Sequence, residues 1–509
     1  MRIDLKAFWL ALVLVLCPAA AAANLEIKSE NIVFYGDVRP EDGKRLVRNL
    51  EIYRSVILAL SEVKNRPDPV PLRIYAFENG KKLNQFASSR GAAGLYLQAS
   101  EGPIFLTVSS GGFRGNKWSS QVAFHEYSHH VLHALSKDVY PRWYDEGFAN
   151  YLSTFNIVDD VITIGAPNVS HGRSIKNGAL MDPETILKAV TRYPATRRLD
   201  KFYGQSWLYV HYLQNTPELS EKLPVYLKAL KDKTDALEAF EQAFGLSIQE
   251  FHKRARLYWN KNTFPVASFK ASPALLKHDV TIAELSDAQF ELAYAKAQLS
   301  FLRKKDAAKF EKKLAKIAPT FGENAEFSLL QAEAAMINKD YERARSYLSK
   351  AIRGGEMSSH LLRLRGDIIY QKLWSEQFGS LEKGEAKTFK TDPELMKAVK
   401  YFEDALTLDS SNKTSNLHLL SLLGRSNAAV SAKSLKAVER SYERFLNTGS
   451  IGEYLSVANV MARTGKPLRA CDNYRYAKGR IDGYEDKDIN DDFARLERFE
   501  QSYPNICEN

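Results

Sequence analysis

Two histidines and a glutamate near position 127 are spaced to act together on one metal ion. Residues 125–129 read His-Glu-Tyr-Ser-His. On an α-helix, positions four apart share a face, so both imidazoles can reach one metal ion while Glu126 points at its open coordination position. Chance alone produces this motif roughly once per hundred chains of such composition, so it is suggestive but not decisive by itself.

A second acidic residue could complete the metal site. Glu146 follows His129 by 17 positions, in a segment that reads Trp-Tyr-Asp-Glu-Gly-Phe-Ala-Asn-Tyr over 143–151. A catalytic zinc site needs three protein ligands and keeps one position for water. A glutamate on a second helix, with Gly147 beside it to permit close approach of the two helices, would meet that need.

These two motifs, in this order and spacing, resemble those of the gluzincin metallopeptidases, in particular peptidase-MA-like proteins with a W-x-x-E-G-x-A-x-Y segment. The resemblance covers about residues 24–262. It implies one zinc ion per chain, held by His125, His129 and Glu146, with Glu126 as the general base. The implied reaction is hydrolysis of a peptide or protein substrate by a zinc-bound water.

Two further residues acquire roles from the resemblance. Tyr203 is the candidate hydroxyl for stabilising the tetrahedral oxyanion, with a packed aromatic residue as the alternative. Asn150 stands where related proteins often place an acidic residue that accepts the ring N–H of a ligating histidine. An amide could still orient the ring, although it would raise the basicity of the ligand less. The alternative for Asn150 is a helix-surface residue.

Three other histidines and one strand need an interpretation. His130 and His133 share the expected metal-binding helix, and we expect them to support the ligands or to lie at the surface. We expect His211 to be a packed helix residue. Residues 103–108 precede the metal-binding helix where gluzincins carry an edge strand, so we expect this strand to bind substrate backbone by strand addition.

The elements that must position these residues begin with a mixed region. Strands are predicted over 32–35, 70–77, 94–98 and 103–108, and helices over 43–63 and 81–87. Further helices are predicted over 119–135, 143–153, 203–214 and a run to about 262. A sheet followed by helices is an α+β arrangement, and the resemblance implies a zincin-like domain with a small mixed sheet.

From about Ala283 the pattern is helical and paired. A small–large–small signature recurs as Ala344/Leu348/Ala351, Ala398/Phe402/Ala405 and Ala470/Tyr474/Ala477. The region resembles degenerate tetratricopeptide repeats, which implies an all-α solenoid for docking proteins; an unrelated helical bundle is the alternative. We thus expect a signal peptide over 1–23, a metallopeptidase domain over 24–262, a linker over 263–282 and a repeat domain over 283–509. The linker contains two prolines, so we expect the halves to be separable.

The N-terminus has the layout of a secretory signal. Arg2 and Lys6 precede an apolar run that ends in small residues at Ala21–Ala23. We therefore expect export to the periplasm or outside the cell, and no transmembrane segment in the mature protein. Removing the signal leaves Cys471 and Cys507. An even pair in an exported protein favours a disulfide, with two free thiols as the alternative.

Composition and charge narrow the function classes. Apolar residues make up 45% and charged residues 26% of the chain, as in ordinary globular proteins. The net charge of +10 is spread thinly, and its densest run, residues 303–316, alternates with apolar residues as a solvated helix face would. We therefore expect no nucleic-acid partner. Two classes remain: an exported zinc metallopeptidase, and a non-catalytic protein-binding scaffold with a vestigial or structural zinc site, which would have no need of Glu126.

Overall fold

The computed structural model describes most of the chain, and its class is α+β, as the sequence predicts. The described residues are 22–60, 67, 70–89, 94–99, 102–109, 118–135, 140–167, 169–176, 180–190, 194, 196, 198–231, 235–322, 324–378, 387–445, 450–481 and 490–508. Most of the predicted signal peptide, residues 1–21, lies outside them. None of the described helices combines the length and the hydropathy that a bilayer span requires.

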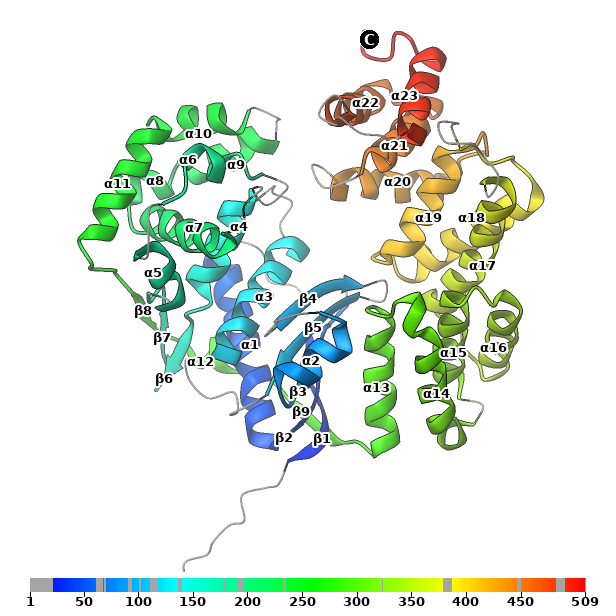
Figure 1. The fold of residues 1–509 in the computed structure, drawn as a ribbon, viewed down its shortest axis with the longest axis horizontal. Coiled ribbons are helices and arrows are strands. Elements are labelled where there is room, and N and C mark those ends of the chain that lie inside the picture. Colours follow the sequence, from blue (N-terminus) through cyan, green and yellow to red (C-terminus); the bar gives the residue numbers. More distant parts are fainter. Residues whose placement is uncertain are drawn as a thin grey trace, which may run out of the picture.

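A six-stranded mixed sheet forms the centre of the N-terminal half (Figure 1). In spatial order its strands are β4 (Gly94–Ala99), β5 (Gly102–Val108), β3 (Leu72–Phe77), β2 (Ile32–Val38), β1 (Ala23–Lys28) and β9 (Thr281–Glu284). β5, β3 and β2 run parallel, whereas β4, β1 and β9 pair antiparallel with their neighbours. Because β5 lies between β4 and β3, the expectation that residues 103–108 form an edge strand is wrong. β4 takes that edge.

Helices cover both faces of this sheet. Side chains alternate between the faces along each strand, so neighbouring residues contact different helices. Ile74 and Phe105 pack with α1 (Pro40–Leu60) and α3 (Trp118–Leu135) on one face. Tyr75 and Leu106 pack with α2 (Gly80–Ala87) and α13 (Asp287–Leu299) on the other. Every residue of β5 is buried, which is typical of a strand covered on both faces. The sheet thereby fixes α3, the helix that carries the predicted histidine ligands.

A second group of helices and a small sheet complete the N-terminal half. The helices are α4 (Arg142–Leu152), α5 (Val169–Lys176), α6 (Pro183–Leu187), α7 (Leu199–Gln214), α8 (Pro217–Ser220), α9 (Leu223–Lys231), α10 (Ala236–Phe244) and α11 (Ile248–Asn260). β6 (Asn156–Val158), β7 (Val161–Ile164) and β8 (Ala267–Lys270) form an antiparallel sheet that the sequence did not predict. Asp159 and Asp160 join β6 to β7 with φ of 47° and 64°, a two-residue turn that asparagine and glycine usually occupy.

Residues 263–282, predicted as a linker, contribute to both sheets. β8 pairs with β7, α12 (Pro273–Leu276) follows it, and β9 begins at Thr281 and pairs with β1. Directly afterwards, α13 packs on the larger sheet, where the hydroxyl of Tyr294 donates to the carbonyl of Ala76 at 2.5 Å. The Tyr294 ring also packs edge-on against Tyr75 and Phe77. The structure therefore favours one folded unit over the separable halves expected from the sequence.

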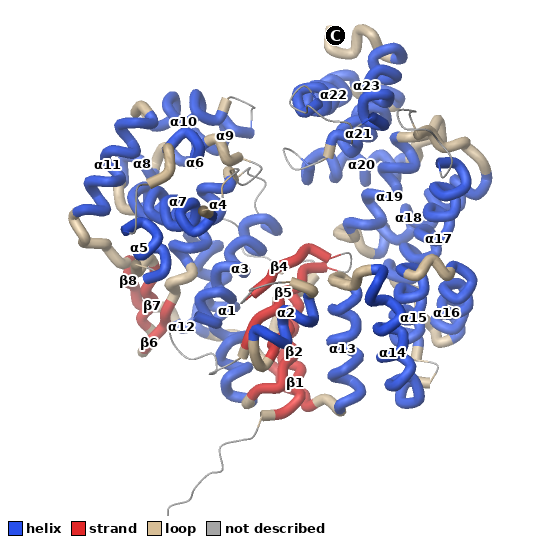
Figure 2. The backbone as a smooth tube through the Cα atoms, viewed as in Figure 1, coloured by secondary structure: helices blue, strands red, loops and turns tan. Residues whose placement is uncertain are grey.

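The C-terminal half is helical among the described residues (Figure 2). After α13 and a short 3₁₀ helix (Lys304–Asp306) come α14 (Ala307–Phe321), α15 (Ala325–Ile337), α16 (Tyr341–Arg353), α17 (Ser359–Phe378), α18 (Pro393–Leu408), α19 (Lys413–Gly424), α20 (Ala432–Phe445), α21 (Ile451–Arg463), α22 (Pro467–Ile481) and α23 (Asn490–Ser502). α15 packs with α16, α17 with α18, and α21 with α22. Figure 1 shows these pairs stacked into a curved array.

Three sequence predictions for this half are confirmed. Tyr474 of the signature is partly buried, and the other eight signature residues are buried: Ala344, Leu348, Ala351, Ala398, Phe402, Ala405, Ala470 and Ala477. α14 buries Phe310 and Leu314 and exposes lysines, so residues 303–316 include a solvated helix face. A disulfide joins Cys471 of α22 to Cys507 near the C-terminus. The paired-helix pattern thus holds, whereas the tetratricopeptide assignment stays a prediction.

Candidate metal centre

The three predicted ligands meet where α3 packs against α4. The Nε2 atoms of His125 and His129 are 3.2 Å apart. Oε2 of Glu146 lies 3.3 Å from Nε2 of His125 and 3.4 Å from Nε2 of His129. Ligands about 2.0–2.1 Å from a tetrahedral zinc ion are separated from each other by about 3.3–3.4 Å. The three atoms therefore form one face of a tetrahedron of the size that zinc requires.

Local packing explains why these side chains converge. Phe124 and Tyr127 anchor α3 in the core, and the hydroxyl group of Tyr53 on α1 lies 2.5 Å from that of Ser128. The helical repeat then places His125 and His129 together on the opposite side of α3, where they are partly exposed. Among the described residues, His125, His129 and Glu146 are the one group of three or more potential ligands with this spacing.

Asp145 supports the site, a role that sequence reasoning did not assign. Its Oδ1 lies 2.8 Å from Nδ1 of His129, and its Oδ2 lies 3.3 Å from Nη1 of Arg142. The side chain is 1% exposed. A carboxylate that accepts the Nδ1 proton of a histidine leaves Nε2 with its lone pair for a metal ion. The only signal in the sequence is an acidic residue directly before the ligand Glu146.

Burial and neighbouring charges shift the pKa values of two predicted ligands in opposite directions. Burial raises the pKa of Glu146, but hydrogen bonds and charge from His125 and His129 outweigh it and hold that pKa well below its usual range. Burial lowers the pKa of His129, but the carboxylates of Asp145 and Glu146 outweigh it and hold that pKa well above its usual range. The imidazoles and the carboxylates therefore stabilise each other's charged forms.

Gly147 brings α4 against α7, not against α3 as the sequence suggested. A Cβ atom at this position would lie 2.3 Å from the carbonyl oxygen of Ser206 and 2.7 Å from Cγ2 of Val210, both on α7. Backbone atoms cannot move away as a flexible side chain can, so only glycine allows this contact. α7 therefore supports the side of α4 next to Glu146, the third predicted ligand.

Tyr203 lies on α7, which packs against α4, and Asn150 lies on α4 itself; their predicted roles stay predictions. Tyr203 is partly buried on α7, one turn before the Ser206 contact with Gly147. Asn150 is 4% exposed, so the interpretation as a helix-surface residue is wrong. Glu126 is partly exposed on α3, next to His125 in the chain.

Two of the other three histidines considered in the sequence analysis are packed inside the fold. His130 is buried, with its Nδ1 3.0 Å from the hydroxyl of Tyr96 on β4, so it supports the position of α3 on the sheet. His211 is buried in α7 and contacts the carbonyl of Gly165 at 2.9 Å, as expected of a packed helix residue. The side chain of His133 lies outside the described part of the chain.

No protein-family model matches this chain, and a search of curated proteins found no match.

Proposed function

We propose that this protein is a zinc metallopeptidase that hydrolyses peptide bonds in a peptide or protein substrate and holds one zinc ion per chain. The observation that carries the proposal is the convergence of three ligand atoms at mutual distances of 3.2–3.4 Å. A carboxylate behind His129 and the chemistry of the set, two imidazoles and a glutamate, also fit zinc.

The number of ligands favours a catalytic over a structural site. Structural zinc sites are almost always closed by four protein ligands, whereas catalytic sites use three and leave one position open. Within the described residues the group has three members, and the side chain of His125 is 19% exposed. A water molecule and a substrate carbonyl could therefore approach the ion from the side of His125.

Three residues of the chain have separate roles in the proposed hydrolysis. When bound, zinc supplies a Lewis acid that lowers the pKa of a water molecule and polarises the substrate carbonyl. Glu126 takes the proton from the attacking water and delivers it to the leaving amine. Asp145 holds the Nδ1 proton of His129 and so keeps its ring in the ligating tautomer. Tyr203 donates a hydrogen bond from its hydroxyl group to the developing oxyanion.

The rest of the chain supports an exported, partner-binding enzyme. The disulfide between Cys471 and Cys507 suits the periplasm or the extracellular space, where disulfides persist. The stacked helix pairs provide a surface on which a protein partner or substrate can dock. We propose no nucleic-acid partner.

Substitution of Glu126 by glutamine tests the proposal. The amide keeps the shape of the side chain but cannot accept a proton, and the three ligands are untouched. Zinc content should therefore persist, while cleavage of casein or a mixed peptide library falls by about 10²–10⁴-fold. His125→Ala should instead lose both zinc and activity. Glu184→Gln on α6, where the side chain is 45% exposed, is the matched control and should change neither.

Two results would contradict this assignment. Full activity in the Glu126→Gln variant would place the chemistry elsewhere. Parent protein that holds zinc but cleaves no library peptide would favour the non-catalytic scaffold.

A further inference from the structure

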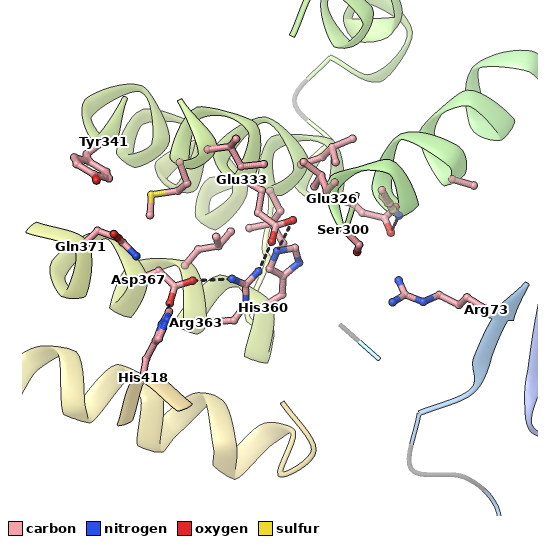
Figure 3. A pocket seen from close by; sticks show the side chains of 18 of the residues that line it. Arg73, Ser300, Glu326, Glu333, Tyr341, His360, Arg363, Asp367, Gln371 and His418 are labelled. Atoms are coloured by element: carbon pink, nitrogen blue, oxygen red, sulfur yellow. Dashed lines mark hydrogen bonds and ion pairs between the residues drawn. The ribbon is translucent and has the colours of Figure 1, made fainter. Parts of the chain in front are cut away.

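The helical array borders a large cavity whose carboxylates are paired within the protein. This cavity has a volume of about 630 Å³ and lies between the six-stranded sheet and the array. Figure 3 shows two of its carboxylates, Glu333 and Asp367, on either side of Arg363. The further pairs are Glu333 with His360, Asp367 with His418, and Glu326 with Lys296. The carboxylates of this cavity therefore need no ligand.

A second, smaller cavity near the C-terminal end of the array is lined by cations and by no carboxylate. It has a volume of about 200 Å³, below the ~300–1,000 Å³ that is usual for sites of drug-sized molecules. Residues of α19, α21, α23 and the adjoining loops line it. Its charged lining residues are Lys387, Arg425, Arg495 and Arg498. A space of this size and charge suits a small anion.

The helical repeat of α23 brings two of these arginines to the cavity. Arg495, Arg498 and Ser502 lie at positions i, i+3 and i+7, which share one face of a helix. Nη1 of Arg498 donates to the hydroxyl of Thr388, so this side chain joins α23 to the segment before α18. From the same segment, the backbone carbonyl of Lys387 accepts a hydrogen bond from Arg425 at 3.3 Å. Three separate parts of the chain thus bring their cations together.

Two carboxylates beside the cavity balance part of this charge. Asp491 accepts a hydrogen bond from Nη1 of Arg425 at 2.7 Å, and Asp492 accepts one from Nη1 of Arg495 at 3.2 Å. Within the described part of the chain, the other two lining cations make no ion pair with a carboxylate. With both carboxylates counted as ionised, the four cations and their two partners carry a net charge of +2.

The guanidinium of Arg495 is poorly solvated. Its side chain is 7% exposed, and its Nη2 donates to the hydroxyl of Ser456 at 2.7 Å. Burial lowers the pKa of Arg495 to about 10, and the charge of Arg425 acts in the same direction. Burial also raises the pKa of Asp492, although both arginines oppose this shift. The positive charge is therefore only partly compensated, and an anion in the cavity would stabilise it.

We propose that this cavity binds a phosphate group, either as the free ion or as part of a small phosphomonoester. A phosphomonoester carries a charge of about −1.5 to −2 at pH 7, which matches the net charge of the site. Guanidinium groups bind phosphate through paired hydrogen bonds. The three or four oxygens of a phosphate can also meet more donors than the two of a carboxylate, and Ser502, Tyr503 and Asn427 supply such donors in the lining.

This inference does not depend on the proposed hydrolysis, because none of the predicted metal ligands lines the cavity. Phosphate binding can therefore be measured without zinc, and the two proposals can fail separately.

Calorimetric titration of the full-length chain, at fixed pH and ionic strength and with a metal chelator present, tests the inference. The probes are inorganic phosphate, glycerol 3-phosphate and acetate. We expect phosphate to bind saturably and acetate to bind about tenfold more weakly or worse, because acetate has one charge and two oxygens. Tighter binding of glycerol 3-phosphate than of phosphate would identify a phosphomonoester as the ligand, and the reverse order would identify the free ion.

Two charge-neutralising variants locate the site. Lys387→Gln and Arg498→Gln remove the two lining cations that have no carboxylate partner among the described residues, so neither change leaves an unpaired acid behind. Each should weaken phosphate binding about tenfold, as expected for the loss of one hydrogen bond to a charged group. Arg353→Gln, at an exposed position on α16 outside the cavity, is the matched control because it removes the same charge.

Four outcomes would overturn the inference. They are the absence of saturable phosphate binding, acetate binding as tightly as phosphate, unchanged phosphate binding in both cavity variants, and equal weakening by Arg353→Gln. Any of these with intact chelator-sensitive peptide cleavage would reject the phosphate site and leave the metallopeptidase proposal standing.

Discussion

Replacing Asp145 by asparagine tests whether a buried carboxylate prepares His129 to bind metal. In the structure, one oxygen of Asp145 faces Nδ1 of His129 and the other faces Nη1 of Arg142, at 2.8 and 3.3 Å. Asparagine has the same shape but only one acceptor oxygen. If that oxygen faces His129, the amide NH₂ faces a guanidinium that also only donates. The variant therefore cannot satisfy both neighbours.

We expect the Asp145→Asn substitution to weaken zinc binding. Loss of a residue that orients a ligand typically weakens metal binding 10- to 100-fold, which corresponds to about 1.4–2.7 kcal/mol. The lower figure applies if the amide oxygen keeps its hydrogen bond to His129, and the higher figure applies if the amide turns towards Arg142. Removing the ligand itself, as in His129→Ala, should cost more.

Competition with a chromophoric zinc chelator at fixed pH measures this affinity. Asp200→Asn is the matched control, because Asp200 is an exposed aspartate at the start of α7 whose carboxylate pairs with the exposed Arg198. Circular dichroism of both variants checks that they fold. If Asp145→Asn binds zinc within about twofold of the parent while His129→Ala does not bind it, Asp145 has no role in the site and the reasoning is refuted.

Three further predictions concern pH, domain integrity and the disulfide. Although burial lowers the pKa of His129, its carboxylate neighbours raise that pKa overall, so His129 must lose a proton before zinc binds. Zinc affinity, measured by chelator competition, should therefore rise with pH until the raised pKa is passed. An affinity that does not change with pH would contradict this prediction. A fragment ending at residue 262 lacks β8, β9 and α13, which cover part of the two sheets, so it should aggregate in size-exclusion chromatography. A monodisperse fragment that binds zinc would show that the two halves fold independently. Replacing Cys471 and Cys507, 36 positions apart, by serine should lower the free energy of unfolding by up to ~4 kcal/mol in denaturant titrations, and an unchanged value would argue against the bridge.

The sequence predicts the elements whose hydrophobic pattern is strong. α1 and α3 carry apolar residues at helical spacing and begin within three residues of their predicted starts. β8 and β9 went undetected because all their side chains are exposed. Backbone hydrogen bonds to β7 and β1 hold them in place, and these leave no trace in a hydrophobic pattern.

Strand order is a second property that the sequence could not supply. β4 and β5 are adjacent in the chain and both read as strands, so either could have been the edge. The outcome depends on which of them pairs with β3, and that pairing is between segments separated by about thirty residues. A substrate that adds a strand at this end of the sheet would therefore meet β4, whose outer edge lies beside no other strand in the described sheet.

The predicted metal ligands and the residue proposed to support them also differ in how well the sequence could identify them. His125 and His129 could be paired from sequence because one helix fixes their relation, whereas the choice between Asp145 and Asn150 depends on how α4 crosses α3. Asn150 lies one turn from Glu146 and shares its face, which made it the natural candidate. Asp145 lies about 100° around α4 from Glu146, and it contacts His129 because the two histidines sit on successive turns of α3. At a helix crossing, the residue directly before a ligand can thus support the second histidine, and an amide at position 150 does not by itself argue against a competent zinc site.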